Sequence, residues 1–208
     1  MTNVVDEITS ESDGARSILN TAIQLFAEKG FDAVSMNDIA KLAGVSKANI
    51  FHHFGSKDAL YLTTLRIASD SSSQVIADTA NADGPFEQRL TDFIHNHLKS
   101  MLENEPATRL LLRELIEHGP QHGKELAEQV FGEHFSGLVS IVLEGQNLGV
   151  LKKEFDPALL ALMLVSNNIF FFQTQQVIRH FPGVSFADDP AAYSHQVMNI
   201  LLNGIKDE

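Results

Sequence analysis

The stretch that decides the fold is SMNDIAKLAGVSKANIFHHF, residues 35–54. It holds two short segments with helical apolar spacing, joined through Gly44-Val45-Ser46. Glycine permits a tight turn, Val45 can fill the angle between two helices, and the hydroxyls of Ser35 and Ser46 are suited to cap helix starts. The stretch therefore predicts a helix-turn-helix.

In a helix-turn-helix, the second helix lies in the major groove of DNA with its first residues facing base edges. Here those residues are Lys47, Ala48 and Asn49. A lysine suits guanine or phosphate, an asparagine can bond adenine through two contacts, and an alanine methyl can touch the methyl of thymine. A helical hairpin that serves only as core is the alternative interpretation.

Helical spacing continues through the rest of the chain, and no segment alternates with the period of two typical of a strand. A helix over 15–29 stops at Gly30, whereas GPQHG at 119–123 is expected to be a loop. Further helices are expected from 57 onward and over 85–104, 106–118, 124–148, 157–180 and 190–205.

The fold class predicted is therefore all-α, with about nine helices. An acidic, flexible tail is expected over 1–14, followed by an N-terminal three-helix helix-turn-helix DNA-binding domain over 15–60. Residues 61–208 are expected to form a larger C-terminal helical domain for ligand binding and dimerisation.

Composition narrows the classes of function and location. The 208 residues include no cysteine, which excludes disulfide scaffolds, thiolate zinc sites and cysteine nucleophiles. The first residues lack the pattern of a signal peptide. The apolar run over 159–172 is interrupted by polar residues and is too short to span a bilayer. We therefore expect a cytoplasmic protein with no membrane partner.

The net charge of −12 argues at first sight against nucleic acid as a partner. The charge is unevenly distributed, however, with −4 over 1–14, +1 over 15–60 and −9 over 61–208. The predicted helix-turn-helix thus lies in the least acidic segment. Whole-chain charge governs solubility and steering, not whether a local surface can contact phosphate.

Nine histidines invite a metal hypothesis, but their spacing does not favour one. Neighbouring pairs either diverge on a helix or are separated by glycine and proline, as in His52/His53, His95/His97 and His118/His122. No serine elbow or carboxylate pair indicates catalysis. We expect no metal, no cofactor and no enzymatic activity.

Residues 16–60 resemble the DNA-binding domain of the TetR family of bacterial transcriptional regulators. The positions that carry the resemblance are Arg16, Ile18, Leu19, Ala22, Leu25, Phe26, Gly30, Phe31, Ser35, Ile39, Ala40, Ala43, Gly44, Val45, Ser46, Phe54, Lys57 and Leu60. The C-terminal region is similar to the family's regulatory domain in layout only.

The resemblance implies a DNA-binding surface and also shows where this chain departs from the family. Phe51 stands where the family usually has a tyrosine that meets a phosphate, and Ala48 stands where it often has glycine. The N-terminal tail is acidic where many members carry a basic arm. The DNA-binding residues implied are Ser35, Ser46, Lys47, Ala48, Asn49, Phe51, His52, His53 and Lys57.

The resemblance further implies a homodimeric, ligand-responsive repressor that releases a pseudo-palindromic operator on binding a small, mostly apolar effector. Aromatic and polar side chains at helical spacing are the candidates for the effector site, although core packing also explains most of them and a surface pair with Glu117 explains Arg113. The candidates are Phe93, His97, Met101, Arg113, Phe131, Phe135, Asn167, Phe171 and Gln175. The dimer candidates lie on the last two helices, which are apolar on more than one face: Phe170, Tyr193, Val197 and Leu201. An interaction protein on the same fold that no longer binds DNA is the alternative.

Overall fold

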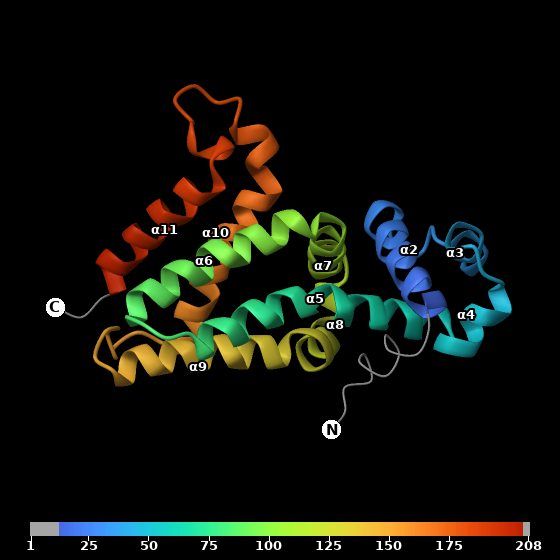
Figure 1. Ribbon diagram of the computed structural model, residues 1–208, viewed down its shortest axis with the longest axis horizontal. Helices are drawn as coiled ribbons and strands as arrows, with labels where there is room; N and C mark the ends of the chain where they lie inside the picture. The colour runs from blue at the N-terminus through green and yellow to red at the C-terminus, as the bar shows by residue number, and fades with distance from the viewer. Residues whose placement is uncertain (1–12, 206–208) are drawn as a thin grey trace. The chain divides into compact units, whose positions relative to one another are not determined.

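The computed structural model describes residues 13–205, and most of the predicted 1–14 tail lies outside them. The all-α prediction is confirmed, since the described part of the chain is helical and contains no strand. The elements are α2 (Asp13–Lys29), α3 (Met36–Ala43), α4 (Lys47–Phe54), α5 (Lys57–Asn81), α6 (Phe86–Glu103), α7 (Glu105–Glu117), α8 (Gly119–Leu126), the π-helix η1 (Ala127–Phe131), α9 (Gly132–Asn147), α10 (Pro157–Ile178), the 3₁₀ helix η2 (Phe186–Asp188) and α11 (Pro190–Ile205) (Figure 1).

The chain divides into two compact units, with the division falling inside α5. Among the described residues, unit 1 comprises 13–71 and 104–131, and unit 2 comprises 72–103 and 132–205. The predicted domains at 15–60 and 61–208 remain a prediction. By packing, however, α7 and α8 group with the N-terminal helices rather than with the C-terminal ones.

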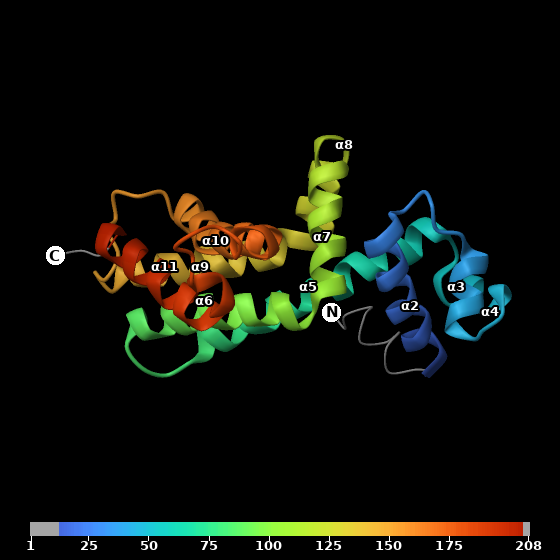
Figure 2. The ribbon, with the colours of Figure 1, turned by 90° about the horizontal axis from the view of Figure 1, so that it is seen from above.

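In unit 1, α2 packs on α3, α4 and α7 (Figure 2). Ile18, Ala22 and Phe26 recur every four residues on one face of α2 and are fully buried. Ile39 of α3 and Ile50 of α4 complete this core. The core fixes the two short helices of the predicted helix-turn-helix against α2.

The predicted loop at 119–123 is wrong, because these residues form the first turns of α8. Pro120 lies in the first turn, where its missing N–H would have no helical partner in any case. The backbone N–H groups of Gln121 and His122 donate to the carbonyl of His118 at 3.0 and 2.8 Å. The helix expected over 124–148 is in turn divided into α8, η1 and α9.

In unit 2, α10 and α11 both pack on α6, and α10 also packs on α9 (Figure 1). The buried guanidinium of Arg89 on α6 closes the carboxyl end of α5, since its Nε and Nη2 donate to the carbonyl of Thr79 at 3.1 and 2.9 Å. Its Nη1 donates to Glu144 of α9 at 2.6 Å, and this bond raises the pKa of Arg89. Arg89 thus joins three helices, a role that the sequence did not indicate.

Helix α10 is 22 residues long and apolar enough to cross a membrane by length and composition, unlike the shorter run considered in the sequence. Such helices also occur as core helices of soluble proteins. Here one side of α10 is buried against α6 and α9 through residues such as Leu160, Leu164 and Phe171. The burial of this side favours a packed helix over a membrane span.

Candidate functional site

The start of α3 is fixed by a reciprocal cap between Ser35 and Asp38. The Ser35 Oγ accepts from the backbone N–H of Asp38 at 3.2 Å, and the backbone N–H of Ser35 donates to Asp38 Oδ2 at 3.0 Å. The Ser35 hydroxyl also donates to Asp38 Oδ2 at 2.6 Å. These bonds from Ser35, the hydroxyl first and the backbone second, lower the pKa of Asp38. The cap therefore occupies the hydroxyl of Ser35, a predicted DNA-binding residue.

The turn between α3 and α4 has the predicted chemistry. Gly44 adopts the left-handed conformation, φ 70° and ψ 27°, which side chains rarely allow. Val45 is half-buried against the unit 1 core, and its N–H donates to the carbonyl of Ala40 at 3.0 Å. The Ser46 Oγ accepts from the backbone N–H of Asn49 at 3.1 Å. These contacts make α4 begin at Lys47.

One side of α4 is exposed to solvent, and we call Lys47, Ala48, Phe51 and His52 the reader face. Phe51 is 43% exposed, and the Nζ of Lys47 lies 5.7 Å from the centre of its ring. The opposite side is anchored by buried Ile50 and Phe54. An exposed side on a helix with a rigid base is what reading a groove requires.

Two further predicted DNA-binding residues of α4 lie at the edge of the reader face. Asn49 and His53 are half-buried, and the Oδ1 of Asn49 is shielded from solvent and has no hydrogen-bond partner. The ring of His53 lies 5.4 Å from that of His52 and 6.0 Å from that of Phe54. A base contact by Asn49 stays a prediction, and it would need the amide to turn outward.

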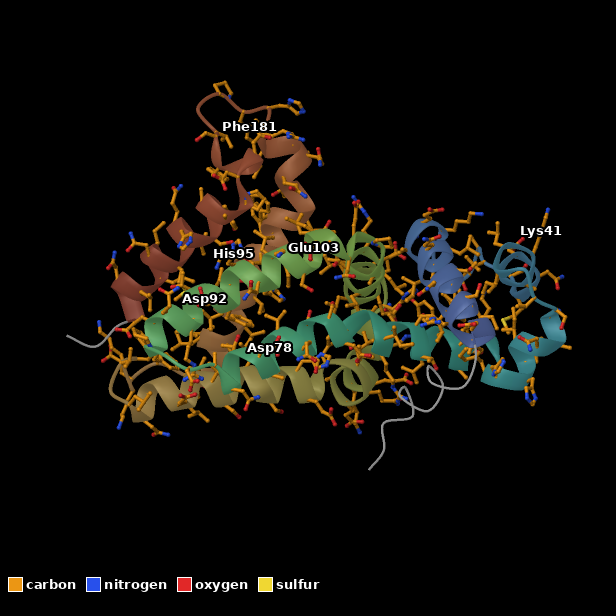
Figure 3. The ribbon with its side chains drawn as sticks, in the orientation of Figure 1. Lys41, Asp78, Asp92, His95, Glu103 and Phe181 are labelled. Atoms are coloured by element: carbon orange, nitrogen blue, oxygen red, sulfur yellow. The ribbon has the colours of Figure 1, made fainter. Side chains whose placement is uncertain are left out.

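Two lysines flank α4 in sequence. The Nζ of Lys57, at the start of α5, lies 4.1 Å from the centre of the Phe31 ring, a cation–π contact that positions the half-buried side chain. Lys41 in the last turn of α3 is exposed and extends outward (Figure 3). Lys41 was not predicted from the sequence as a DNA-binding residue, although a lysine between the buried Ala40 and the turn glycine faces away from the core by helical spacing.

In unit 2, two predicted effector residues stack in the core. Phe93 and His97 of α6 are buried, with ring centres 5.6 Å apart and planes 17° apart. Burial lowers the pKa of His97 to about 4. The Nδ2 of Asn168 on α10 lies 3.0 Å from His97 Nδ1 and donates to the Ile94 carbonyl at 2.9 Å, whereas its Oδ1 has no partner.

The sequence singled out the neighbouring Asn167, which is placed differently. Its Nδ2 donates to the carbonyl of Met163 within α10 at 2.8 Å. The signal for Asn168 was its spacing of four from Leu164 and three from Phe171, both of which are buried. An amide on the buried side of an apolar helix needs a polar partner, and His97 supplies it.

The other predicted effector residues do not form one cluster. Met101 and Phe171 are buried in unit 2, Gln175 is half-buried, and Phe135 is 37% exposed. In unit 2, a groove of about 330 Å³ is lined by other residues, among them Ser73, Ile76, Ala77, His134, Gly137 and Ser140.

Phe131 and Arg113 belong to unit 1. The Nε of Arg113 donates to Glu117 at 2.9 Å, as its spacing predicts. The Nη1 of Arg113 reaches the carbonyls of Ala27 and Glu28 at 3.5 and 3.4 Å. Arg113 thus neutralises the carboxyl end of α2.

The outward side of α10 is mostly apolar, interrupted by exposed Ser166 and Gln173, and forms the candidate dimer surface. Phe170 is 65% exposed, while Tyr193 packs against Phe171 and donates its hydroxyl to the Asn167 carbonyl at 2.7 Å. Val197 and Leu201 are half-buried, and Leu201 packs on the unit 2 core. The exposed apolar residues that the sequence analysis did not name for this surface are Leu159, Leu162, Met163, Val177 and, on α11, Ile200.

Comparisons with known proteins agree with this architecture. A family model described as bacterial regulatory proteins of the tetR family matches residues 18–64. IcaR of Staphylococcus aureus (strain Newman), named as a biofilm operon icaADBC HTH-type negative transcriptional regulator, is 36% identical over 64 residues, or 31% of this chain and 34% of IcaR. The chain thus matches about a third of that relative's length.

Two longer matches cover most of the chain. RutR of Escherichia coli (strain K12), an HTH-type transcriptional regulator, is 24% identical over 196 residues, covering 92% of this chain and 90% of RutR. The structure of the fatty acid degradation regulator FadR from Bacillus halodurans superposes with a TM-score of 0.77 at 19% identity, covering 93% of this chain and 97% of FadR, and shows the shared fold alone. These relatives are regulators, which agrees with the prediction that the chain is not an enzyme.

Proposed function

We propose that the chain, whose residues 18–64 match the model of the tetR family of bacterial regulatory proteins, is a member of that family and a cytoplasmic, homodimeric repressor. It would bind a pseudo-palindromic operator and release it on binding a small effector. The observation that carries DNA binding is the reader face, which presents Lys47 to solvent on a helix anchored from behind by Ile50 and Phe54. The similarity to IcaR, which is a negative transcriptional regulator, supports repression.

The test is the binding of fluorescently labelled DNA from upstream of the protein's own gene, in the presence of excess random DNA. Lys47→Glu reverses a charge at the centre of the contact and should abolish binding, because repulsion replaces attraction to phosphate or guanine. Lys153→Glu makes the same charge change at an exposed site in unit 2 and should leave binding intact. A parent protein that shows no preference for any upstream DNA would favour the alternative of an interaction protein.

The dimer part of the proposal is supported by the exposed apolar side of α10. Soluble monomers rarely leave large contiguous apolar patches uncovered, and a two-fold axis lets one such surface pair with itself. Phe170→Asp would place an unpaired carboxylate in the interface and should yield monomers. The matched control is Ser136→Asp, which places the same charge at an exposed position of α9. Light scattering that finds the parent monomeric would overturn this part.

The effector part is supported by the chemistry around His97. Phe93 and Phe171 supply apolar surface, and the partnerless Oδ1 of Asn168 could accept a hydrogen bond from a ligand. These residues are packed closed, so binding would require α6 and α10 to separate. An effector acts only by binding one arrangement more tightly than the other. Asn168→Leu should remove the response to an effector from a host extract while sparing the affinity for DNA.

A further inference from the structure

A hollow of about 160 Å³ lies within unit 1, among α5, α7, α8 and the segment that leads into α3. It has no part in the function proposed above. One half of its lining is apolar and the other half is rich in acids and histidines. The lining residues are Phe31, Asp58, Tyr61, Leu62, Leu65, Glu114, His118, His122, Glu125 and Leu126.

The carboxylate of Glu114 is the centre of the polar half. Glu114 is 3% exposed, and its Oε2 accepts from the Tyr61 hydroxyl at 2.5 Å and lies 2.8 Å from His118 Nδ1. Its other oxygen, Oε1, lies 3.8 Å from His122 Nδ1, too far for a hydrogen bond. The Glu114 Oε2 is therefore held by two partners, whereas the His122 ring does not reach Oε1. Burial and the bond to Glu114 both raise the pKa of Tyr61, so the hydroxyl remains a donor.

The hollow has acidic groups without a matching cation. Asp58 and Glu125 are exposed in its lining, which contains neither lysine nor arginine. Four basic residues adjoin lining residues in sequence, and each has another partner. Arg66 donates to Gln129, Arg113 pairs with Glu117, and Lys124 lies 3.7 Å from Glu128. Lys57 lies against the ring of Phe31, at the apolar wall. The partners of the Glu114 carboxylate carry no permanent positive charge, because Tyr61 is a hydroxyl donor and the His118 ring is a cation only when protonated. Burying a carboxylate is costly, and a bound cation would offset that cost.

The apolar half selects the body of the ligand. Leu62, Leu65 and Leu126 form one wall, and the rings of Phe31 and Tyr61 lie 4.8 Å apart as another. A volume near 160 Å³ equals that of about five waters, which suits a compact ring with a short polar arm. No group of three or more His, Asp or Glu among residues 13–205 is arranged to hold a metal ion. An organic cation therefore fits better than a metal.

We propose that this hollow is a binding site for a small amine with an apolar body, whose ammonium group is held by Glu114. The body lies against the leucines and aromatic rings, and the ammonium donates to Glu114 Oε1. Asp58 and Glu125 add attraction to the entering cation. The site belongs to the unit that carries the reader face, and its existence does not depend on DNA binding.

The test is calorimetric titration of the full chain with benzylamine, which is a cation at neutral pH. Benzyl alcohol and benzoate match its ring and size with neutral and negative groups. Benzylamine should bind at one site per chain, and the other two should bind at least tenfold more weakly. Failure of benzylamine to bind, or equal binding of benzyl alcohol, would overturn the proposal.

Variants locate the site. Glu114→Gln keeps the shape, removes the charge and should weaken benzylamine at least tenfold, whereas Glu128→Gln on η1, exposed and outside the hollow, should change nothing. If Glu114→Gln fails to fold, the exposed pair Asp58→Asn and Glu125→Gln should still weaken benzylamine several-fold. Unchanged affinity in a folded Glu114→Gln, or in the double variant, would contradict the assignment. If Zn²⁺ binds more tightly than benzylamine, and His118→Ala abolishes the binding of Zn²⁺, the hollow is a metal site instead.

Discussion

The α3–α4 turn and the α6–α10 contact are held together by different kinds of interaction. In the turn, Ser35, Gly44 and Ser46 act on backbone groups within a few residues of themselves, and their side chains or backbone remain at the surface. In the α6–α10 contact, His97 and Asn168 meet across 71 positions of sequence in a buried core. A surface built from local bonds can meet a partner without loss of stability, whereas a buried contact must open before it can bind anything.

The largest expected difference concerns an aromatic side chain in each region. Phe93→Ala in the α6 core should lower the free energy of unfolding by about 3–5 kcal/mol, because it leaves a cavity. Phe51→Ala on the reader face should change it by about 0.5 kcal/mol or less, since the ring is partly exposed. Urea denaturation of both variants measures the difference. Equal losses would mean that Phe51 is part of the core.

The next difference is in the response to acid. The pKa of His97 falls from 6.5 to about 4 in the folded chain, so the folded state resists protonation. The stability due to the neutral ring is complete above pH 6.5 and is lost as the pH falls toward 4. The loss over that interval is about 3 kcal/mol. Unfolding curves should show that His97→Gln reduces this pH dependence and that His195→Gln, at an exposed site on α11, does not. The same slope in the parent and His97→Gln would contradict the burial argument.

A smaller effect is expected from the cap of α4. Ser46→Ala removes the acceptor for the Asn49 N–H and should lower stability by about 1 kcal/mol. Ser140→Ala on α9 removes a hydroxyl that bonds only within its own helix, so its effect should be about 0.5 kcal/mol or less. Thermal unfolding can compare the two. A Ser46→Ala variant as stable as Ser140→Ala would show that the core alone sets the start of α4.

The smallest expected effect concerns Lys57. Lys57→Ala should weaken binding to operator and random DNA alike, because a phosphate contact does not specify sequence. The slope of log affinity against log salt should fall by about one unit. Titrations at several salt concentrations measure that slope. An unchanged slope would mean that Lys57 does not contact phosphate and serves only to contact the Phe31 ring.

The sequence predicted well where the signals are local. The serine caps and the glycine turn act within four residues, so α3 and α4 begin and end as expected. In the same way, the helix expected over 157–180 begins at Pro157, where α10 begins.

Prediction failed where distant segments decide the outcome. Helical spacing alone did not select Asn168 over Asn167, because the difference depends on where His97 lies. A second error was local: Gly119-Pro120 was interpreted as a break, yet α8 brings His118 and His122 together, with ring centres 5.9 Å apart, beside the buried Glu114. For Arg113, spacing predicted the pair with Glu117, but not the contact of its guanidinium with the end of α2. The spacing of residues along one helix does not show which side chains or carbonyls of another helix they will meet.

The most direct test of the central claim, that α4 of each subunit in a dimer reads DNA, is selection of binding sites from a random DNA library by the purified parent protein. We expect enrichment of a pseudo-palindrome whose half-sites lie about one helical turn or a multiple of it apart. We also expect that Lys47→Glu enriches no sequence. A library that the parent leaves unenriched, or a motif that Lys47→Glu still selects, would contradict it.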